Sequence, residues 1–266
     1  MAVTFKPEPG VRYDMPVVFG PSEMPRTTTY GEKHTIIHTF LTEPDAVEPL
    51  IPYHFSLAEP AKISVIARMH RGVDWLAWRN YNSVRVSVDV VARHGDEVLR
   101  GPYGLVVWES DPRPAIVGRE YLGTSKICGE IPDHVYEGDR ASFECLEYGT
   151  PLLRVDVDGI TAADAEAVAA RNERPESVTL CWKYIPGPGG TVDADYPIKM
   201  VSRGTIDSLS TGRSTLTWGD TTWEQCPISH RIVDALAALP VVEILPATLT
   251  VAAGSVLDRG ASARLD

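Results

Sequence analysis

The chain has 266 residues, of which 44% are hydrophobic and 23% are charged, and its formal net charge is −11. This length allows one large domain or two small ones, and the composition is ordinary for a globular protein. The acidic charge argues against a nucleic-acid-binding protein, which needs a basic face, and against an anionic membrane as a partner. An anionic small molecule would need cations placed around its own site.

The four cysteines are too far apart in sequence to form a CxxC pair, so they give no sign of a zinc or redox motif. The N-terminal residues lack the charged and apolar regions of a signal peptide. No stretch approaches the roughly 20 apolar residues that a membrane-spanning helix needs. We therefore expect a cytoplasmic protein with reduced thiols.

Residues 1–30 are rich in proline and glycine and have no hydrophobic period, which predicts an extended N-terminal arm. The clearest strand is Asn82–Arg93, in which apolar and polar residues alternate. Its two faces carry Val84, Val86, Val88 and Val90 on one side and Arg85, Ser87 and Asp89 on the other. His94-Gly95-Asp96 then predicts a hairpin turn.

Several further short strands and only a few helices are expected in the rest of the chain. An alanine-rich stretch after Thr161 predicts a helix that runs to Ala170, and the tail from Gly254 is expected to be loosely held. The sequence shows no regular alternation of strands and helices and no break in composition. We therefore predict a mostly β (α+β) fold with a mainly antiparallel sheet, in a single domain over residues 31–266.

Motifs for phosphate, metal and serine chemistry are missing from the sequence. The glycine-rich Pro186–Gly190 lacks the lysine and the serine or threonine of a phosphate loop, and it predicts a hairpin turn instead. The seven histidines are scattered, and no Gly-x-Ser-x-Gly elbow is present. No metal site and no cofactor are expected.

The stretch from Pro112 to Gly129 carries the strongest candidate for chemistry. Ala115–Val117 is expected to form an apolar strand, which leads through Gly118-Arg119-Glu120 and a glycine-containing turn to Lys126. Most lysines are solvated, so Lys126 by itself is a weak candidate. However, the residues after it are apolar, the nearby glycines allow tight turns, and Glu120 belongs to a segment expected inside the protein.

The motif PAIVGREYLGTSK, residues 114–126, resembles the acetoacetate decarboxylase family, which carries a Gly-Arg-Glu and its catalytic lysine at this spacing. The likeness extends in the same order to LTEPDAVEPLIP, WKYIPGPGG and LPVVEILPATLTV. It covers most of the chain after about residue 25. It implies an antiparallel β-cone or barrel with a few peripheral helices, which usually forms a homo-oligomer. It also implies that Lys126 forms a Schiff base with a small keto acid.

A neutral amine adds to the ketone in such chemistry, and the resulting iminium accepts electrons as a carbanion develops on the adjacent carbon. The pKa of a lysine is ordinarily about 10.4, so burial or a neighbouring cation must favour the neutral amine. Acetoacetate decarboxylase is itself a known case of a lysine activated in this way. The activation is therefore implied by the resemblance.

Several positions depart from the pattern of the family. The decarboxylases have a second lysine directly after the nucleophile, where this chain has Ile127. Their early substrate-binding arginine corresponds to Lys33, which keeps the charge but loses the guanidinium fork. Two pocket glutamates correspond to about Val65 and Tyr81, and only the tyrosine can exchange a proton. Relatives that condense keto acids with aldehydes carry a tyrosine that corresponds to about Ala253.

These residues predict a Schiff-base-forming lyase that acts on a small β-keto acid or 2-keto acid. Lys126 is the expected nucleophile and Tyr81 a proton-transfer group, while Lys33 or Arg68 would anchor the carboxylate of the substrate. An aldolase-dehydratase that condenses a keto acid such as pyruvate with an aldehyde is the closest alternative. A non-catalytic keto-acid-binding or oligomer-forming protein is an alternative of another class.

Arg119 and Glu120 complete the expected site as substrate-binding residues. A purely structural role is as plausible for both residues, because their side chains could form an ion pair with each other inside the fold. The expected partners of the protein are a small keto acid and further copies of the same chain.

Overall fold

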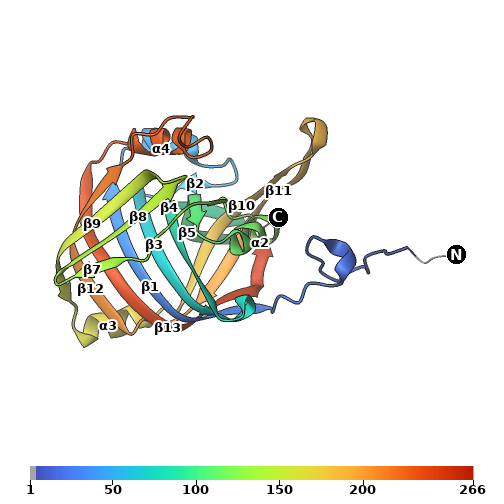
Figure 1. Cartoon of the computed structure of the whole chain (residues 1–266), viewed down its shortest axis with the longest axis horizontal. Coiled ribbons are helices and arrows are strands. Elements are labelled where there is room, and N and C mark those ends of the chain that lie inside the picture. The colour runs from blue at the N-terminus through green and yellow to red at the C-terminus, as the bar shows by residue number, and fades with distance from the viewer. Residues whose placement is uncertain (1–3, 266) are drawn as a thin grey trace.

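The structure of the protein, a computed structural model, describes residues 4–265. A 13-stranded sheet makes up most of it (Figure 1). The strands are β1 (Thr27–Leu41), β2 (Ser56–Leu57), β3 (Lys62–Val73), β4 (Arg79–His94), β5 (Glu97–Glu109), β6 (Lys126–Cys128), β7 (Val135–Glu137), β8 (Arg140–Glu147), β9 (Thr150–Ala162), β10 (Glu176–Pro186), β11 (Val192–Arg203), β12 (Ser208–Trp218) and β13 (Glu243–Arg264).

The helices are short, and all but η1 lie between strands in the sequence. The α-helices are α1 (Pro44–Val47), α2 (Pro112–Leu122), α3 (Ala165–Asn172) and α4 (His230–Ala237). The 3-10 helices are η1 (Val17–Phe19), η2 (Glu48–Leu50), η3 (Asp74–Leu76) and η4 (Pro188–Gly190). Among the described residues, no helix is long and apolar enough to cross a membrane.

The order of neighbouring strands is β1-β3-β4-β5-β10-β11-β13-β12-β9-β8-β7, and β1 also pairs with β13. This extra pairing, which sets Tyr30 opposite Ser255, closes a circuit through β1, β3, β4, β5, β10, β11 and β13. The pairings of β5 with β10 and with β6 are parallel, whereas those along β1, β3, β4 and β5 are antiparallel. Figure 1 shows these strands curving side by side around the body.

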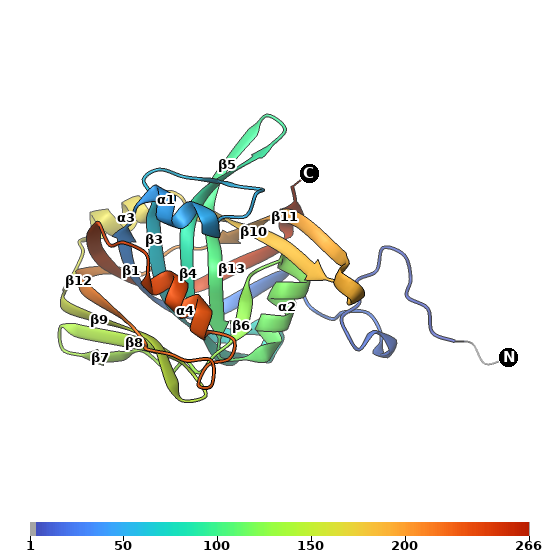
Figure 2. The same ribbon diagram turned by 90° about the horizontal axis from the view of Figure 1, so that it is seen from above.

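The hydrophobic core lies on one face of β3 and β4. Ile63, Val65, Val84 and Val86 are fully buried there, and they belong to one cluster with apolar residues of β8, β9 and α4. Figure 2 shows α4 lying between the β8–β9 side and the β4–β5 side of the protein. The opposite face of β3 and β4 does not enter this core, and it lines the cavity described below.

The predicted mostly β fold with a mainly antiparallel sheet is confirmed, and so is the hairpin turn at Gly95 between β4 and β5. Two local predictions are wrong. The alanine-rich helix starts at Ala165 with Asp164 as its N-cap, because Thr161 is still paired in β9. The C-terminal tail is a strand rather than a loose end, because β13 pairs with both β1 and β11.

Residues 4–26 contain no regular element other than η1 before β1 begins at Thr27. Figure 1 shows this N-terminal segment leading away from the body of the sheet. The division of the chain into an arm over residues 1–30 and a domain over residues 31–266 stays a prediction, and residues 1–3 and 266 lie outside the described part.

Candidate active site

Helix α2 occupies the stretch for which the sequence predicted a strand at Ala115–Val117, so that prediction is wrong. The helix begins because the Asp111 side chain accepts a hydrogen bond of 2.8 Å from the backbone N–H of Arg113, and Pro112 follows the cap. It ends at Gly123, whose φ of 65° is left-handed. Asp111, Pro112 and Gly123 are helix-capping signals that the sequence contains. The prediction gave more weight to the apolar residues Ala115–Val117 between them.

Lys126 opens β6, directly after the turn that follows α2. Its Nζ lies 2.6 Å from Oε1 of Glu109, and it donates a hydrogen bond of 3.1 Å to the backbone carbonyl of Pro114. The side chains of Lys126 and Glu109 are only 16% and 3% exposed, so this pair lies inside the protein. The end of β5 and the first turn of α2 therefore hold the amine between them.

Gly118 makes room for the lysine on the surface of α2. A Cβ at this position would stand 2.5 Å from Cδ and 2.7 Å from Cε of Lys126, and 2.6 Å from Oγ1 of Thr124. These distances are shorter than van der Waals contact, so only glycine lets the lysine stem lie against the helix. The glycine of the motif thus sets the path of the lysine side chain.

Burial raises the pKa of the Glu109 carboxyl, and the neighbouring Lys126 opposes that rise. The second carboxyl oxygen, Oε2, is buried and has no hydrogen-bond partner among residues 4–265. Glu109 can therefore exchange a proton with the amine through Oε1, while Oε2 is left without a protein partner.

A cavity of about 500 Å³ opens in front of Lys126. The alternate residues of β3 and β4 that turn away from the core form much of its wall. They are Lys62, Ser64, Ile66, Arg68 and His70 on β3, and Tyr81, Ser83, Arg85, Ser87 and Asp89 on β4. The cavity therefore lies on the polar face that the alternation in Asn82–Arg93 predicts.

Cations dominate the charge of this cavity. Lys33, Arg68 and Arg85 line it together with Lys126. Burial and the two arginines lower the pKa of Lys33 to about 8. Burial, with Arg68 as a further cause, lowers the pKa of Arg85 to about 9. Such shifts are those of positive charges held close together away from water.

Aromatic residues close one part of the cavity. His70 stacks on Tyr81 with ring centroids 4.4 Å apart, and its Nε2 is 3.1 Å from Oγ of Ser83. Tyr81 is hydrogen-bonded to Tyr30, and burial raises the pKa of its hydroxyl well above the ordinary value. Burial also keeps the pKa of His70 well below its ordinary value, so His70 is neutral and Tyr81 keeps its proton near pH 7.

A sequence profile described as acetoacetate decarboxylase (ADC) matches residues 14–260. The chain belongs to the acetoacetate decarboxylase family. The members of this family are enzymes, and the chain is an acetoacetate decarboxylase-like enzyme. A comparison with curated protein sequences gives no match.

Solved structures of acetoacetate decarboxylases have a similar fold. One, from Legionella pneumophila subsp. pneumophila str. Philadelphia 1, has 18% identity and a TM-score of 0.70 over 90% of this chain and 89% of its own. Another has 15% identity and a TM-score of 0.73 over 93% and 92%. The enduracididine biosynthesis enzyme MppR, solved with pyruvate, has 14% identity and a TM-score of 0.70 over 96% and 98%. Identities this low show a shared fold alone.

Lys126, Tyr81, Lys33 and Arg68, which the sequence singled out, are all brought together around one cavity. Arg119 and Glu120 do not line it. Arg119 is exposed on α2 and donates a hydrogen bond of 2.8 Å to the backbone carbonyl of Lys126 from outside.

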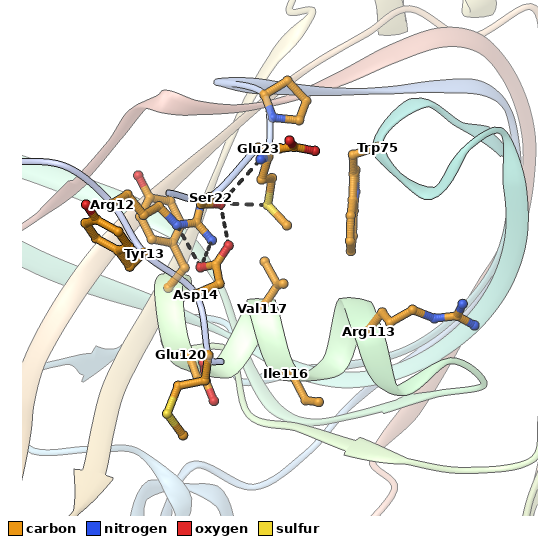
Figure 3. Close-up of a pocket in the computed structure, with 14 residues that line it drawn as sticks. Arg12, Tyr13, Asp14, Ser22, Glu23, Trp75, Arg113, Ile116, Val117 and Glu120 are labelled. Carbon is orange, nitrogen blue, oxygen red and sulfur yellow. Dashed lines mark hydrogen bonds and ion pairs between the residues drawn. The ribbon is translucent and has the colours of Figure 1, made fainter. Parts of the chain in front are cut away.

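Glu120 is exposed, so the expectation that it lies inside is wrong. It lines a different pocket, of about 620 Å³, between α2 and the N-terminal arm. Figure 3 shows that pocket, with Ile116, Val117 and Glu120 on α2 and Arg12, Asp14 and Ser22 on the arm. Arg119 and Glu120 follow each other on a helix, so they point in different directions and form no ion pair.

Three positions that depart from the acetoacetate decarboxylase pattern also lie off the cavity. Val65 is fully buried in the core, and Ile127 is partly buried against the same core. Ala253 is exposed on β13. Because side chains alternate along a strand, Val65 and Ile127 sit one residue away from the cavity positions Ile66 and Lys126.

The sequence did not single out Glu109 or Arg85 as site residues. Glu109 ends an apolar strand and could have drawn notice as a carboxylate after Val107 and Trp108, yet such a residue is equally typical of a solvated strand end. Arg85 stands on the polar face of a clear alternation, which usually faces water. Among the described residues, no group of three or more His, Cys, Asp or Glu side chains could hold a metal ion.

Proposed function

We propose that the protein is a Schiff-base-forming lyase that acts on a small β-keto acid or 2-keto acid, with Lys126 as the nucleophile. The observation that carries the proposal is the contact of 2.6 Å between Lys126 Nζ and Glu109 Oε1 in a cavity that Lys33, Arg68 and Arg85 also line. A buried amine beside a proton acceptor suits imine formation, and the cations suit a carboxylate.

Imine formation begins when Glu109 takes a proton from Lys126, so that the neutral amine can add to the ketone carbon of the substrate. The carbinolamine then loses water, with Glu109 returning the proton to the departing hydroxyl. Arg68 binds the substrate carboxylate, and its two parallel N–H groups match the two carboxylate oxygens. The product of these steps is an iminium that bears the substrate carbons.

In the decarboxylation branch, which requires a β-keto acid, the bond between the carboxylate and the adjacent carbon breaks. Carbon dioxide leaves, and the electron pair of the bond moves into an enamine. Tyr81 then protonates the enamine carbon, and water hydrolyses the imine to release the ketone. Glu109 and Lys126 return to their starting state, and Tyr81 regains its proton from water, because the overall reaction consumes one proton.

Condensation with an aldehyde is the second candidate, and the cationic wall favours it. Lys33, Arg68 and Arg85 stabilise the carboxylate of the bound substrate, and decarboxylation must move that charge away from them. An interaction that is stronger in the ground state than in the transition state does not accelerate a step. In the condensation branch, Glu109 instead removes a proton from the carbon beside the iminium, and the enamine attacks the aldehyde carbon while the carboxylate stays in place. The aldehyde oxygen takes that proton back from Glu109. Loss of water then forms the conjugated double bond, and hydrolysis of the imine frees Lys126.

Borohydride reduction tests the proposal. The protein is incubated with acetoacetate or pyruvate, reduced, and examined by intact mass and peptide mapping. A mass increase located on Lys126 and missing from Lys126→Ala is expected. It equals the keto acid minus one oxygen atom or, where carbon dioxide leaves before the reduction, the resulting ketone minus one oxygen atom. The proposal would be falsified if no adduct forms with any member of a panel of keto acids, an outcome that favours a non-catalytic binding protein.

Product analysis separates the two branches once an adduct is found. Release of carbon dioxide from a β-keto acid marks decarboxylation. A new conjugated ultraviolet band that requires both pyruvate and an aldehyde marks condensation with dehydration. Each assay is repeated with Lys126→Ala, which should give neither signal.

Cytoplasmic location and assembly into a homo-oligomer accompany the proposed function as further expectations. Cell fractionation checks the first. Light scattering coupled to size-exclusion chromatography checks the second, since a mass equal to that of one chain would contradict it.

A further inference from the structure

Three cations of the cavity form a diagonal line across three neighbouring strands. Lys33 on β1 stands opposite His70, two residues along β3 from Arg68. Arg68 stands opposite Ser83, two residues along β4 from Arg85. Diagonal neighbours of this kind in antiparallel strands lie about 7–8 Å apart. The line therefore has two intervals, one between Lys33 and Arg68 and one between Arg68 and Arg85.

The carboxylates of the cavity do not neutralise this line. Glu109 is engaged with Lys126. Asp89, whose charge acts on Arg85, is engaged at 2.7 Å with Lys62. Among residues 4–265, no Asp or Glu forms an ion pair with Lys33, Arg68 or Arg85. The buried Nε of Arg85 has no hydrogen-bond acceptor within that range either.

The remaining neighbours of the line are neutral. Burial raises the pKa of Cys181 to about 12 and keeps that of His70 well below its ordinary value. The hydroxyls of Tyr30 and Tyr81 are protonated near pH 7, because burial raises the pKa of both. Unpaired charges away from water are unfavourable, so the line as a whole calls for anionic ligand groups.

A substrate with one carboxylate can fill only one interval of the line. We propose that the substrate of this enzyme carries two carboxylates and is a keto dicarboxylate, held along the line of Lys33, Arg68 and Arg85. The proposal rests on the proposed function for its keto group, which reacts with Lys126, and it adds the second anionic group.

The register places each carboxylate. Arg85, Val107 and Lys126 lie in one row across β4, β5 and β6, so the interval between Arg68 and Arg85 is the nearer one to the amine. It takes the carboxylate adjacent to the keto group. The interval between Lys33 and Arg68 takes the distal carboxylate, beside Tyr30, whose ring centroid is 5.7 Å from Lys33 Nζ.

The size of the cavity agrees with a longer substrate. Its volume of about 500 Å³ equals the liquid volume of roughly 17 water molecules at about 30 Å³ each. Pyruvate or acetoacetate fills only a small part of such a space, whereas a dicarboxylate can reach from Lys126 to Lys33.

Two matched pairs of acids test the proposal on the full chain. Acetoacetate and 3-oxoglutarate differ by one carboxylate, and so do butyrate and glutarate, which cannot form an imine. We expect 3-oxoglutarate to reach half-maximal borohydride trapping on Lys126 at a concentration at least about 10-fold lower than acetoacetate, because one charge-assisted contact changes affinity by about that factor or more. Glutarate should exceed butyrate in calorimetric affinity for Lys126→Ala by the same factor.

Lys33→Met locates the second carboxylate. This variant should reduce the preference for the dicarboxylate in both pairs to about 2-fold, with most of the loss of affinity on the dicarboxylate. Lys199→Met, which removes a lysine paired with Glu97 outside the cavity lining, should retain the full preference.

The outcomes separate this proposal from the proposed function. Equal affinities for the members of each pair overturn the dicarboxylate site, whether or not an imine forms. A preference that survives Lys33→Met overturns it as well. Tighter binding of glutarate without any trapped adduct supports the dicarboxylate site and counts against the Schiff-base function alone.

Discussion

Strands β3 and β4 send alternate residues to two buried faces whose compositions differ. Toward the core, Ile63, Val65, Val84 and Val86 are fully buried in one hydrophobic cluster. Toward the cavity, the same strands present Arg68 and Arg85 with serines around them. The first face gains its stability from burial of apolar surface, whereas the second holds charges that burial disfavours. A shift of one residue along either strand therefore moves a side chain from the hydrophobic core to the wall of the cavity.

Among the substitutions on the cavity side, we expect the largest loss of reaction rate at Glu109. Glu109→Gln keeps the size of the side chain but removes the proton acceptor beside Lys126, so the rate of imine formation should fall by about 10²–10⁴-fold. The rate is measured by adding borohydride to samples taken at successive times and determining the fraction of protein that carries the adduct. Glu120→Gln makes the same chemical change on the outside of α2 and should leave the rate unchanged, and an equal loss in both variants would contradict the placement of Glu109.

Gly118→Ala should be the next largest effect. The added Cβ displaces Lys126 Cδ and Cε, and a displacement of about 1 Å in a reacting group costs roughly 10²-fold in rate. Alanine is favoured over glycine inside a helix by about 1 kcal/mol, so thermal unfolding should not occur at a lower temperature. If the variant reacts at the wild-type rate, imine formation does not depend on the close contact of the Lys126 side chain with α2.

One pair of isoleucines on β3 compares the two faces directly. Ile63→Ala leaves a hole in the core and should lower the free energy of unfolding by about 2–5 kcal/mol. Ile66→Ala only enlarges the cavity, where water can enter, and should lower it by about 1 kcal/mol. Urea unfolding of both variants measures the difference, and equal losses would mean that both faces act as core.

Lys33→Met should change the free energy of unfolding in the opposite direction. The pKa of Lys33 falls from 10.5 to about 8 in the folded protein, so removal of its charge should raise the free energy of unfolding at pH 7 by up to about 3 kcal/mol. Between pH 8 and 10.5 the unfolded wild-type chain binds more protons here than the folded chain, so wild-type stability rises with pH. The advantage of the variant should therefore disappear by about pH 10.5 in urea unfolding, and a constant advantage would contradict this cause.

The sequence predicted the parts of this fold that depend on local alternation. The strand over Asn82–Arg93 and the separation of its two faces were correct, because period-two patterning is a direct consequence of strand geometry. The strand predicted at Ala115–Val117 was wrong, because its apolar residues outweighed the cap at Asp111. The pairing of β1 with β13 could not be predicted, since it joins ends of the chain that share no local pattern.

In the candidate site too, residues in local motifs were predicted, whereas contacts that depend on strand pairing were not. Lys126 was found through a motif, and Lys33, Arg68 and Tyr81 through its likeness to a family. Glu109 was missed because its contact with Lys126 depends on β6 pairing with the end of β5, and no spacing in the sequence shows that pairing. For the same reason, the sequence did not reveal that the polar face of β4 surrounds a cavity rather than meeting solvent.

The path from Glu109 to Lys126 is one uninterrupted piece of chain. It supplies the amine, the acid that serves it, the carbonyl of Pro114 that receives its hydrogen bond and the glycine that accommodates it. The cations that we propose bind the substrate come instead from β1, β3 and β4. In evolutionary terms, the reactive centre can be inherited whole while substitutions elsewhere retune which acid it receives, so relatives with the same lysine need not share a substrate.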